Sequence, residues 1–364
     1  MTKNTFHLVS LGCAKNSVDS DSMAQLLVRD GYRSMDDPDK AAVLIVNTCG
    51  FIGPAKEESY RVLGELAKSK LNGQVLIAAG CLTQRYGVEV AQKIPGIDGI
   101  LGTRRWMDIV QVVQEVRKGK RPEPIYHLPD APTVGLDEKD AQRVSVSGAS
   151  AYIKVADGCR RPCAFCAIPL IKGTAVSRPV ESIIKEARTL RDAGLRELVL
   201  IAQDTTDYGH DLGMKDGLAI LLEQLTDAVP DMDWMRVMYA YPGYVTDRLI
   251  EVMATRRQVL PYLDMPLQHA HPKTLYRMKR PSNMDWVYKT IGKMREAMKD
   301  LAIRTTFIVG YPGETEEEFQ ALYDFVKEIR FDRVGAFQFS FEPGTTSTPL
   351  GDPVPAPVKQ ERYE

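Results

Sequence analysis

Three cysteines close together are the residues of this chain whose types and spacing most clearly suggest chemistry. Cys159, Cys163 and Cys166 are separated by three and then two residues, and Gly158 and Pro162 bend the chain around them. Three thiolates on a four-iron cluster leave one iron without a protein ligand, whereas iron–sulfur clusters are normally held by four cysteines. The spacing therefore predicts a cluster with one iron open to a further ligand, which is a sign of catalysis more than of electron storage.

A structural zinc site is the alternative interpretation of the same three cysteines. Zinc sites usually combine four ligands in paired two-residue spacings. No second pair lies near this loop. The iron–sulfur interpretation is therefore favoured.

The first 120 residues alternate apolar runs with amphipathic patterns, which predicts a parallel sheet covered by helices on both faces. The predicted strands are 6–11, 42–47, 74–79 and, more weakly, 97–101, and helical patterns cover 18–29, 56–70 and 108–118. We assign 1–120 to an N-terminal α/β domain and the proline-rich stretch 121–150 to a linker.

The other three cysteines each follow one of these predicted strands. Cys13 comes after the first strand, Cys49 after the second and Cys81 after the third. In a parallel sheet such positions share the carboxyl edge, where open α/β folds bind ligands. A glycine that permits a tight turn sits beside each one: Gly12, Gly50 and Gly80. A single one of them would be read as a buried core cysteine, but three at strand ends predict a second three-cysteine iron–sulfur cluster.

From residue 151 onward six further strand-and-helix repeats predict an open (βα)6 barrel of the TIM type. The predicted strands are 151–155, 197–202, 235–239, 262–266, 305–309 and 335–340, with a helix over 179–192. Thr315 and Glu318 form a capping-box pattern at the start of another helix. The loop of Cys159 follows the first strand, at the carboxyl mouth where such barrels keep their active sites. We assign 151–345 to this partial barrel and 346–364 to a C-terminal tail.

Composition excludes several classes of protein. The net charge is −1, from 47 Lys and Arg against 48 Asp and Glu, which argues against direct binding of nucleic acid. No apolar run approaches the roughly 20 residues of a membrane span, and the N-terminus lacks a secretory signal. Six cysteines in a large chain of this kind favour metal binding over disulfides. We predict a cytoplasmic protein that does not associate with membranes.

Both cysteine triplets and the motifs around them resemble one family, the radical S-adenosylmethionine (SAM) methylthiotransferases, and within it the branch that modifies small-subunit ribosomal protein S-twelve. The resembling segments span nearly the whole chain and include Ser10-Leu11-Gly12-Cys13-Ala14-Lys15-Asn16, Val46-Asn47-Thr48-Cys49-Gly50, Lys154-Val155-Ala156-Asp157-Gly158-Cys159, Gln203-Asp204-Thr205-Thr206, Tyr239-Ala240-Tyr241-Pro242, Asp264-Met265-Pro266-Leu267-Gln268-His269 and Val309-Gly310-Tyr311-Pro312-Gly313-Glu314. Asp204-Thr205-Thr206 and Tyr241-Pro242 favour this branch over the branch that modifies tRNA. The small C-terminal β-barrel (TRAM domain) typical of the family is not recognisable here.

The resemblance implies two [4Fe-4S] clusters and SAM as cofactors. Cys159, Cys163 and Cys166 would hold the catalytic cluster that reductively cleaves SAM, and the resulting deoxyadenosyl radical would take hydrogen from an aspartate β-carbon. The cluster on Cys13, Cys49 and Cys81 would present the sulfur, which a second SAM methylates. The implied partners are the S-twelve protein as substrate, a reductant of the flavodoxin or ferredoxin type, and a sulfur donor.

Other site residues are weaker predictions. The resemblance places Phe165 near the adenine of SAM, and Gln203 and Gln268 are candidates for contacting SAM or substrate, although a strand-end polar role is as plausible for both glutamines. His269 and His271 are predicted to make loop hydrogen bonds and not to bind metal.

Three alternative functions stay open at this point. They are a tRNA methylthiotransferase acting on a modified adenosine, an electron carrier with two clusters, and a zinc-stabilised binding module.

Overall fold

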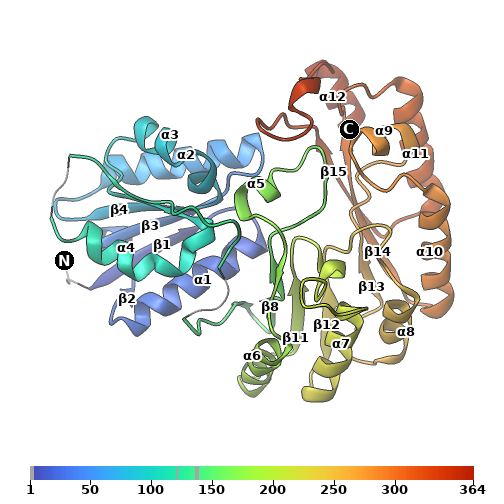
Figure 1. The fold of residues 1–364 in the computed structure, drawn as a ribbon, viewed down its shortest axis with the longest axis horizontal. Helices are drawn as coiled ribbons and strands as arrows, with labels where there is room; N and C mark the ends of the chain where they lie inside the picture. Colours follow the sequence, from blue (N-terminus) through green and yellow to red (C-terminus); the bar gives the residue numbers. More distant parts are fainter. Residues whose placement is uncertain (1–3, 120–121, 136–138) are drawn as a thin grey trace. The chain divides into compact units, whose positions relative to one another are not determined.

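The computed structural model describes residues 4–119, 122–135 and 139–364, which form two compact units (Figure 1). The first unit comprises Met1–Ser145, Asp157–Cys159 and Ala167–Val176, and the second comprises Val146–Ala156, Arg160–Cys166 and Ser177–Glu364. Two short segments on either side of the cysteine loop therefore pack with the N-terminal part of the chain.

A six-stranded parallel sheet with strand order β2-β1-β3-β4-β5-β6 is the centre of the first unit, as the apolar runs predict. Its strands are β1 (Thr5–Ser10), β2 (Arg33–Ser34), β3 (Val43–Thr48), β4 (Val75–Gly80), β5 (Gly99–Gly102) and β6 (Ile125–His127). Its helices are α1 (Ala14–Arg29), α2 (Gly53–Ser69), α3 (Cys81–Lys93) and α4 (Ile109–Val116), with short 3-10 turns η1 (Pro38–Lys40) and η2 (Thr103–Asp108).

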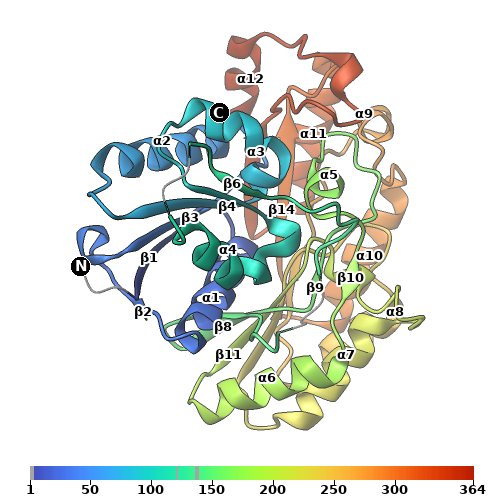
Figure 2. The same cartoon turned by 60° about the vertical axis from the view of Figure 1, so that its left-hand side comes forward.

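Both faces of this sheet are covered, because successive residues of its central strands point to opposite sides. Val43 and Ile45 pack in a core with α1 and α4, whereas Leu44 and Val46 pack in a second core with α2 and α3. Figure 2 shows the two helix pairs on opposite faces. The predicted doubly covered α/β fold is confirmed.

The stretch predicted as a linker contains two strands, although residues 121 and 136–138 of it lie outside the described residues. Strand β6 extends the first sheet, and β7 (Val144–Ser147) pairs with the first barrel strand. His127 anchors β6, since its Nε2 lies 2.9 Å from Asp108 Oδ2. Three residues of strand are too few to show an alternating pattern, which is why the sequence reads as a linker there.

The second unit contains the six parallel barrel strands, which form two separate groups. In the described residues of this unit the two groups do not close into a barrel. One group runs β12-β11-β8-β7 and the other β13-β14-β15. The six strands are β8 (Ser150–Lys154), β11 (Glu197–Ile201), β12 (Trp234–Val237), β13 (Tyr262–Asp264), β14 (Ala302–Val309) and β15 (Arg333–Gln338). The predicted open TIM-type barrel is confirmed. A small separate sheet pairs β9 (Ala156–Asp157) with β10 (Val176–Ser177).

Helices follow the barrel strands. They are α5 (Ile168–Lys172), α6 (Val180–Asp192), α7 (Gly217–Ala228), α8 (Asp247–Thr255), α9 (Pro272–Arg277), α10 (Met284–Ala297), α11 (Glu316–Ile329) and α12 (Ala356–Tyr363), with 3-10 turns η3 (Thr205–Asp207) and η4 (Thr348–Leu350). Helix α11 begins with the predicted capping box, in which Thr315 and Glu318 satisfy each other's backbone N–H groups. None of the described helices is both long and apolar enough to cross a membrane.

The segment 346–364, predicted as a tail, carries η4 and α12. Helix α12 is held by two ion pairs that the sequence does not reveal. Arg362 bonds Glu314 at 2.8 Å, and Lys359, only 6% exposed, pairs with Asp352. Glu314 in turn accepts the backbone N–H of Gly310 at 2.9 Å, so α12 supports the turn that follows β14.

Candidate iron–sulfur sites

The N-terminal cysteines lie together at the carboxyl edge of the first sheet, as predicted. A Cβ placed on Gly12 would stand 3.0 Å from Cys49 Sγ, so the turn before Cys13 packs directly on Cys49. A Cβ on Gly50 would stand 3.0 Å from the carbonyl carbon of Cys81. Both glycines are therefore required by close approach of the three turns. None of the six cysteines forms a disulfide.

Three helices begin beside these cysteines without a side-chain cap. Cys13 is the N-cap of α1, α2 begins four residues after Cys49, and Cys81 is the first residue of α3. The first backbone N–H groups of a helix have no intrahelical acceptor, and its N-terminus carries partial positive charge. Three such ends at one place favour an anion. A cluster held by three thiolates is anionic, so this edge fits one.

Two buried asparagines and a serine fix the turns that carry Cys13 and Cys49. Asn16 donates to the carbonyls of Leu11 and Asn47 at 2.6 and 3.0 Å, and Asn47 donates back to the Asn16 carbonyl at 3.0 Å. Ser59 Oγ accepts the N–H of Cys49 at 3.0 Å. Asn16 and Asn47 stand in the resembling motifs, which is the only signal that pointed to them, and nothing in the sequence pointed to Ser59.

Four charged side chains are buried together in the first unit, each no more than 6% exposed. Lys172 Nζ lies 3.0 Å from carboxylate oxygens of both Asp19 and Asp157. Arg143 lies 2.5 Å from Asp19 and 3.4 Å from Asp157. Its guanidinium also stacks on Trp106, 4.2 Å from the ring centre. Two positive and two negative charges therefore neutralise each other, and we call this group the four-charge network.

The four-charge network lies next to Cys81. Burial raises the pKa of the Cys81 thiol to about 12, and the charge of Lys172 opposes that rise. Although burial lowers the pKa of Lys172, the carboxylates of Asp157 and Asp19 raise it by more, so this lysine stays charged. A metal that binds Cys81 must displace its proton, and the ammonium of Lys172 favours the thiolate that results.

The same network reaches the loop of Cys159. Asp157 accepts the N–H of Gly158 at 3.2 Å. Gly158 has φ +78°, and a Cβ there would stand 2.0 Å from the Thr174 carbonyl oxygen. Cys159 N–H then donates to the Gly173 carbonyl at 3.0 Å. Arg178 pairs with Glu186 at 2.7 Å.

In the second unit the cysteine loop is held by backbone bonds to two distant segments. Ala164 N–H donates to the Met278 carbonyl, and Ser347 N–H donates to the Ala164 carbonyl, both at 2.9 Å. Cys166 N–H donates to the Cys163 carbonyl at 3.1 Å. Ala164, between Cys163 and Cys166, is thereby fixed, while these two cysteines stay partly exposed.

Cys163 has two polar neighbours. Its Sγ lies 3.6 Å from the hydroxyl of Tyr241 and 3.5 Å from Nη1 of Arg280. Tyr241 belongs to a resembling motif, whereas no sequence signal pointed to Arg280.

Two arginines that lie between Cys159 and Cys163 are neutralised by the loop after β11. Arg160 bonds Asp207 at 2.6 Å, and Arg161 bonds Asp204 at 2.6 Å. The Asp204-Thr205-Thr206 motif therefore serves partly to hold the cysteine loop.

The remaining predicted site residues lie in the cysteine loop and after two of the barrel strands. Phe165 packs against the buried cluster of Met278, Tyr311 and Phe339. Gln203 follows β11 and is half-buried. Gln268 follows β13 with φ +73°, an uncommon conformation for a residue other than glycine that often marks a functional position. Contact of these three with SAM stays a prediction.

His269 is fully buried, and its Nδ1 accepts the backbone N–H of His271 at 3.0 Å, which confirms the predicted loop hydrogen bond. Among the described residues, no group of three or more His, Cys, Asp or Glu stands close enough to hold a single metal ion. Each thiolate of a four-iron cluster binds a different iron, so cluster ligands stand farther apart than the ligands of one zinc ion.

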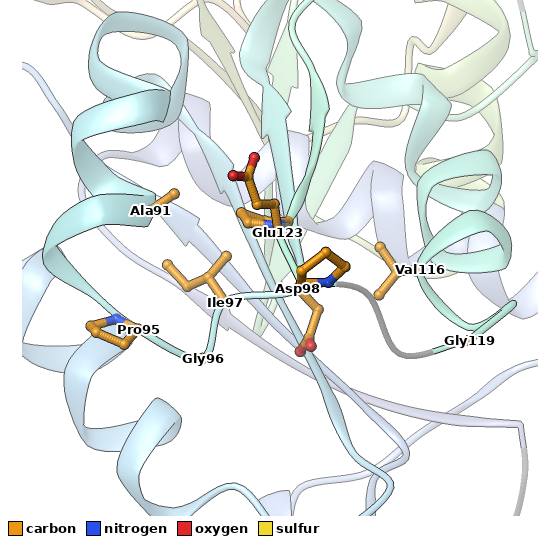
Figure 3. A pocket seen from close by; sticks show the side chains of 10 residues that line it. Ala91, Pro95, Gly96, Ile97, Asp98, Val116, Gly119 and Glu123 are labelled. Atoms are coloured by element: carbon orange, nitrogen blue, oxygen red, sulfur yellow. The ribbon is translucent and has the colours of Figure 1, made fainter.

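Two pockets lie away from the cysteines, at the amino ends of strands. The pocket in Figure 3 has about 300 Å³ and is lined by residues that precede β5 and β6, among them Ile97, Asp98 and Glu123. The other has about 400 Å³ and is lined by Tyr152, Glu197, Arg236 and neighbours near the start of the barrel strands. Neither contains a predicted site residue.

Comparison with known proteins accounts for both units. Residues 5–102 match the family described as uncharacterized protein family UPF0004, and residues 153–326 match the radical SAM superfamily. The chain is 46% identical to a protein of Roseiflexus sp. and 47% identical to one of Chloroflexus aurantiacus, both named "Ribosomal protein uS12 methylthiotransferase RimO". These alignments cover 98% of this chain and 79% and 81% of the relatives. The chain belongs to the family of uS12 methylthiotransferases.

Solved structures agree with the fold. The radical SAM methyltransferase TsrM from Kitasatospora setae superposes with a TM-score of 0.68 at 13% identity, covering 96% of this chain and 77% of TsrM. The radical SAM enzyme OxsB gives a TM-score of 0.62 at 10% identity, covering 89% of this chain and 52% of OxsB. Membership of the methylthiotransferase family makes the chain a SAM-using enzyme that transfers a sulfur-containing group, with a [4Fe-4S] cluster and SAM as cofactors. The electron-carrier and zinc-module alternatives do not fit this family.

Replacing Lys172 with methionine should lower the free energy of unfolding of the first unit by about 3–5 kcal/mol, because the network would lose one of its two cations and Asp19 and Asp157 would keep a buried negative charge that Arg143 alone does not balance. Urea unfolding of the metal-free protein measures the change. Lys68→Met is the matched control, since Lys68 is exposed on α2 and should change stability little. Equal stabilities of the two variants would contradict the description of the network.

Replacing Gly158 with alanine should displace the Cys159 loop and reduce iron bound on reconstitution, because the new Cβ meets the Thr174 carbonyl oxygen. Gly194→Ala is the control: Gly194 also has positive φ, +86°, but no atom lies within 4 Å of its added Cβ. Gly194→Ala should lower the stability only by the backbone strain at that position, about 1–3 kcal/mol, and should bind as much iron as the parent protein. Full iron in Gly158→Ala would show that the close approach is not needed.

Proposed function

We propose that this chain attaches a methylthio group to the β-carbon of an aspartate in ribosomal protein uS12. The name carried by relatives at 46% and 47% identity over nearly the whole chain supports this substrate. It also favours uS12 over a modified adenosine of tRNA, the alternative that the sequence left open.

The reaction calls for radical chemistry. A saturated carbon next to a carboxylate has no good leaving group, so polar substitution there is hard, and the cofactor must supply the reactivity while the protein supplies orientation. A [4Fe-4S] cluster with SAM would supply a carbon radical, which can remove a hydrogen atom from such a carbon. We assign Cys159, Cys163 and Cys166 as the ligands of this cluster.

The meeting of Cys13, Cys49 and Cys81 at one sheet edge carries the proposal. One cluster would serve any radical SAM enzyme, whereas a sulfur transferase also needs a place to hold the sulfur. The three cysteines, with three uncapped helix ends and the ammonium of Lys172 beside them, suit a second anionic cluster with an open iron. We therefore propose that these residues hold an auxiliary [4Fe-4S] cluster that presents the sulfur.

Three other residues are proposed to act at the SAM site. Phe165 would lie against the adenine, with the buried Tyr311 and Phe339 behind it. Gln203 and Gln268, at the ends of β11 and β13, would donate to SAM or to the substrate aspartate. The proposed partners are uS12 as substrate, a flavodoxin- or ferredoxin-type reductant and a sulfur donor.

Anaerobic reconstitution should load about eight irons per chain, and about four in each of the variants Cys159→Ala and Cys13→Ala, because each removes one ligand from one cluster. Iron and acid-labile sulfide analysis measures this. Four irons in the parent that are lost with Cys159→Ala but kept with Cys13→Ala would contradict the auxiliary cluster.

The reconstituted enzyme, given SAM and dithionite, should add the mass of one methylthio group to uS12, and tandem mass spectrometry should place it on an aspartate. A tRNA that carries the modified adenosine, but no methylthio group, is offered in a parallel reaction. A mass gain on the tRNA with no mass gain on uS12 would identify tRNA, and not uS12, as the substrate. Deoxyadenosine formation without either product would show radical cleavage of SAM with another acceptor.

A further inference from the structure

Arg280 is a buried cation without a carboxylate partner in the described part of the chain. It is 9% exposed. Its neighbours there are Cys163 Sγ, the Pro266 carbonyl oxygen and the ring of Tyr241, and its Nε–H has no acceptor among the described residues. Burying an unpaired charge is costly, so this guanidinium requires an anion that the protein chain itself does not supply.

The other arginines near the cysteine loop do not share this property. Arg161, which stacks on the same Tyr241 ring at 4.6 Å, bonds Asp204 at 2.6 Å. Arg277, three residues before Arg280, bonds Glu318 at 2.5 Å. The local charges of Arg161 and Arg277 are therefore cancelled, and of these three arginines Arg280 alone has no carboxylate partner among the described residues.

Two donors converge on Cys163 Sγ. Nη1 of Arg280 stands 3.5 Å from the sulfur, and the Tyr241 hydroxyl stands 3.6 Å from it. The Arg280 guanidinium lies over the Tyr241 ring, 4.2 Å from its centre, so each residue holds the other in place. A thiolate sulfur on a cluster accepts hydrogen bonds, and it is the nearest anion that these donors would meet.

We propose that Arg280 is the internal counter-ion of the SAM-binding cluster and that, together with Tyr241, it sets the reduction potential of that cluster through Cys163. The inference rests on the proposed assignment of Cys163 as a cluster ligand. Reduction adds negative charge to the cluster, and hydrogen bonds and positive charge at its sulfurs stabilise the reduced form. Arg280 therefore raises the potential and makes it easier to load the electron that cleaves SAM.

The test isolates one cluster by using full-length protein in which Cys13, Cys49 and Cys81 are alanine. Arg280→Met in this background should hold about four irons per chain and show a more negative midpoint potential in an EPR-monitored redox titration. Tyr241→Phe should shift the potential in the same direction by less, because only a neutral donor is lost. Arg257→Met, at an exposed arginine, and Tyr244→Phe, at the neighbouring tyrosine, are the matched controls and should keep the parent potential.

Full iron with an unchanged potential in Arg280→Met would overturn the proposal. If Arg280→Met does not hold iron, the same measurement is made on Arg280→Gln, whose neutral amide can still bond the Pro266 carbonyl. A midpoint potential below that of the parent supports the counter-ion role of Arg280. A midpoint potential equal to that of the parent overturns it. A background protein that binds no iron would instead overturn the ligand assignment of the proposed function, on which this inference depends.

Discussion

Four charges buried together are tolerated in a protein only when each one is paired, because each ion loses its hydration on burial. In the first unit this condition joins helix α1, residue 143, strand β9 and helix α5 at one point, through Asp19, Arg143, Asp157 and Lys172. Asp157 stands two residues before Cys159, and Lys172 is near enough to Cys81 to affect its pKa. The network therefore determines where the Cys159 segment sits on the sheet that carries the other cysteine triplet. Apolar side chains in place of these ions would be buried at a lower cost in free energy. They would not, however, specify which segment packs against which, as a paired charge does.

Backbone geometry imposes a second constraint at the same sheet edge. Strands β1, β3 and β4 are parallel, so the turns after them emerge side by side. The turns approach so closely that Gly12 and Gly50 have no room for a side chain. This crowding brings three cysteines and three helix N-termini to one place and leaves those helices without side-chain caps. A capping Ser or Asp would stabilise each helix, yet it would also occupy the N–H groups that an anionic cluster requires. Local stability is thus given up where the proposed auxiliary cluster would bind.

Site residues could be predicted from the sequence where they occupy the same place in each strand-and-helix repeat. Residues that are brought together from distant parts of the chain could not be predicted. Cys13, Cys49 and Cys81 could be found because each follows an apolar strand, and the box of Thr315 and Glu318 because it spans four residues. Lys172 pairs with Asp19 across 153 positions, and Arg280 reaches Cys163 across 117. No periodicity links such residues, and a lone Lys or Arg usually indicates an exposed surface. Strands β2 and β6 were missed for another reason: with two and three residues they are too short to alternate.

The two cysteine sites differ in how the protein compensates charge around them. Near Cys81 the cation is Lys172, whose charge two carboxylates already balance, so it contributes little net field beyond its immediate neighbour. Near Cys163 the cation is Arg280, which has no carboxylate in the described part of the chain. Since an unbalanced charge acts more strongly on a nearby redox centre than a balanced one, the surroundings of Cys163 favour electron uptake and those of Cys81 do so less. Such a difference would suit the proposed pair of clusters, of which one would be reduced to cleave SAM and the other would hold the sulfur.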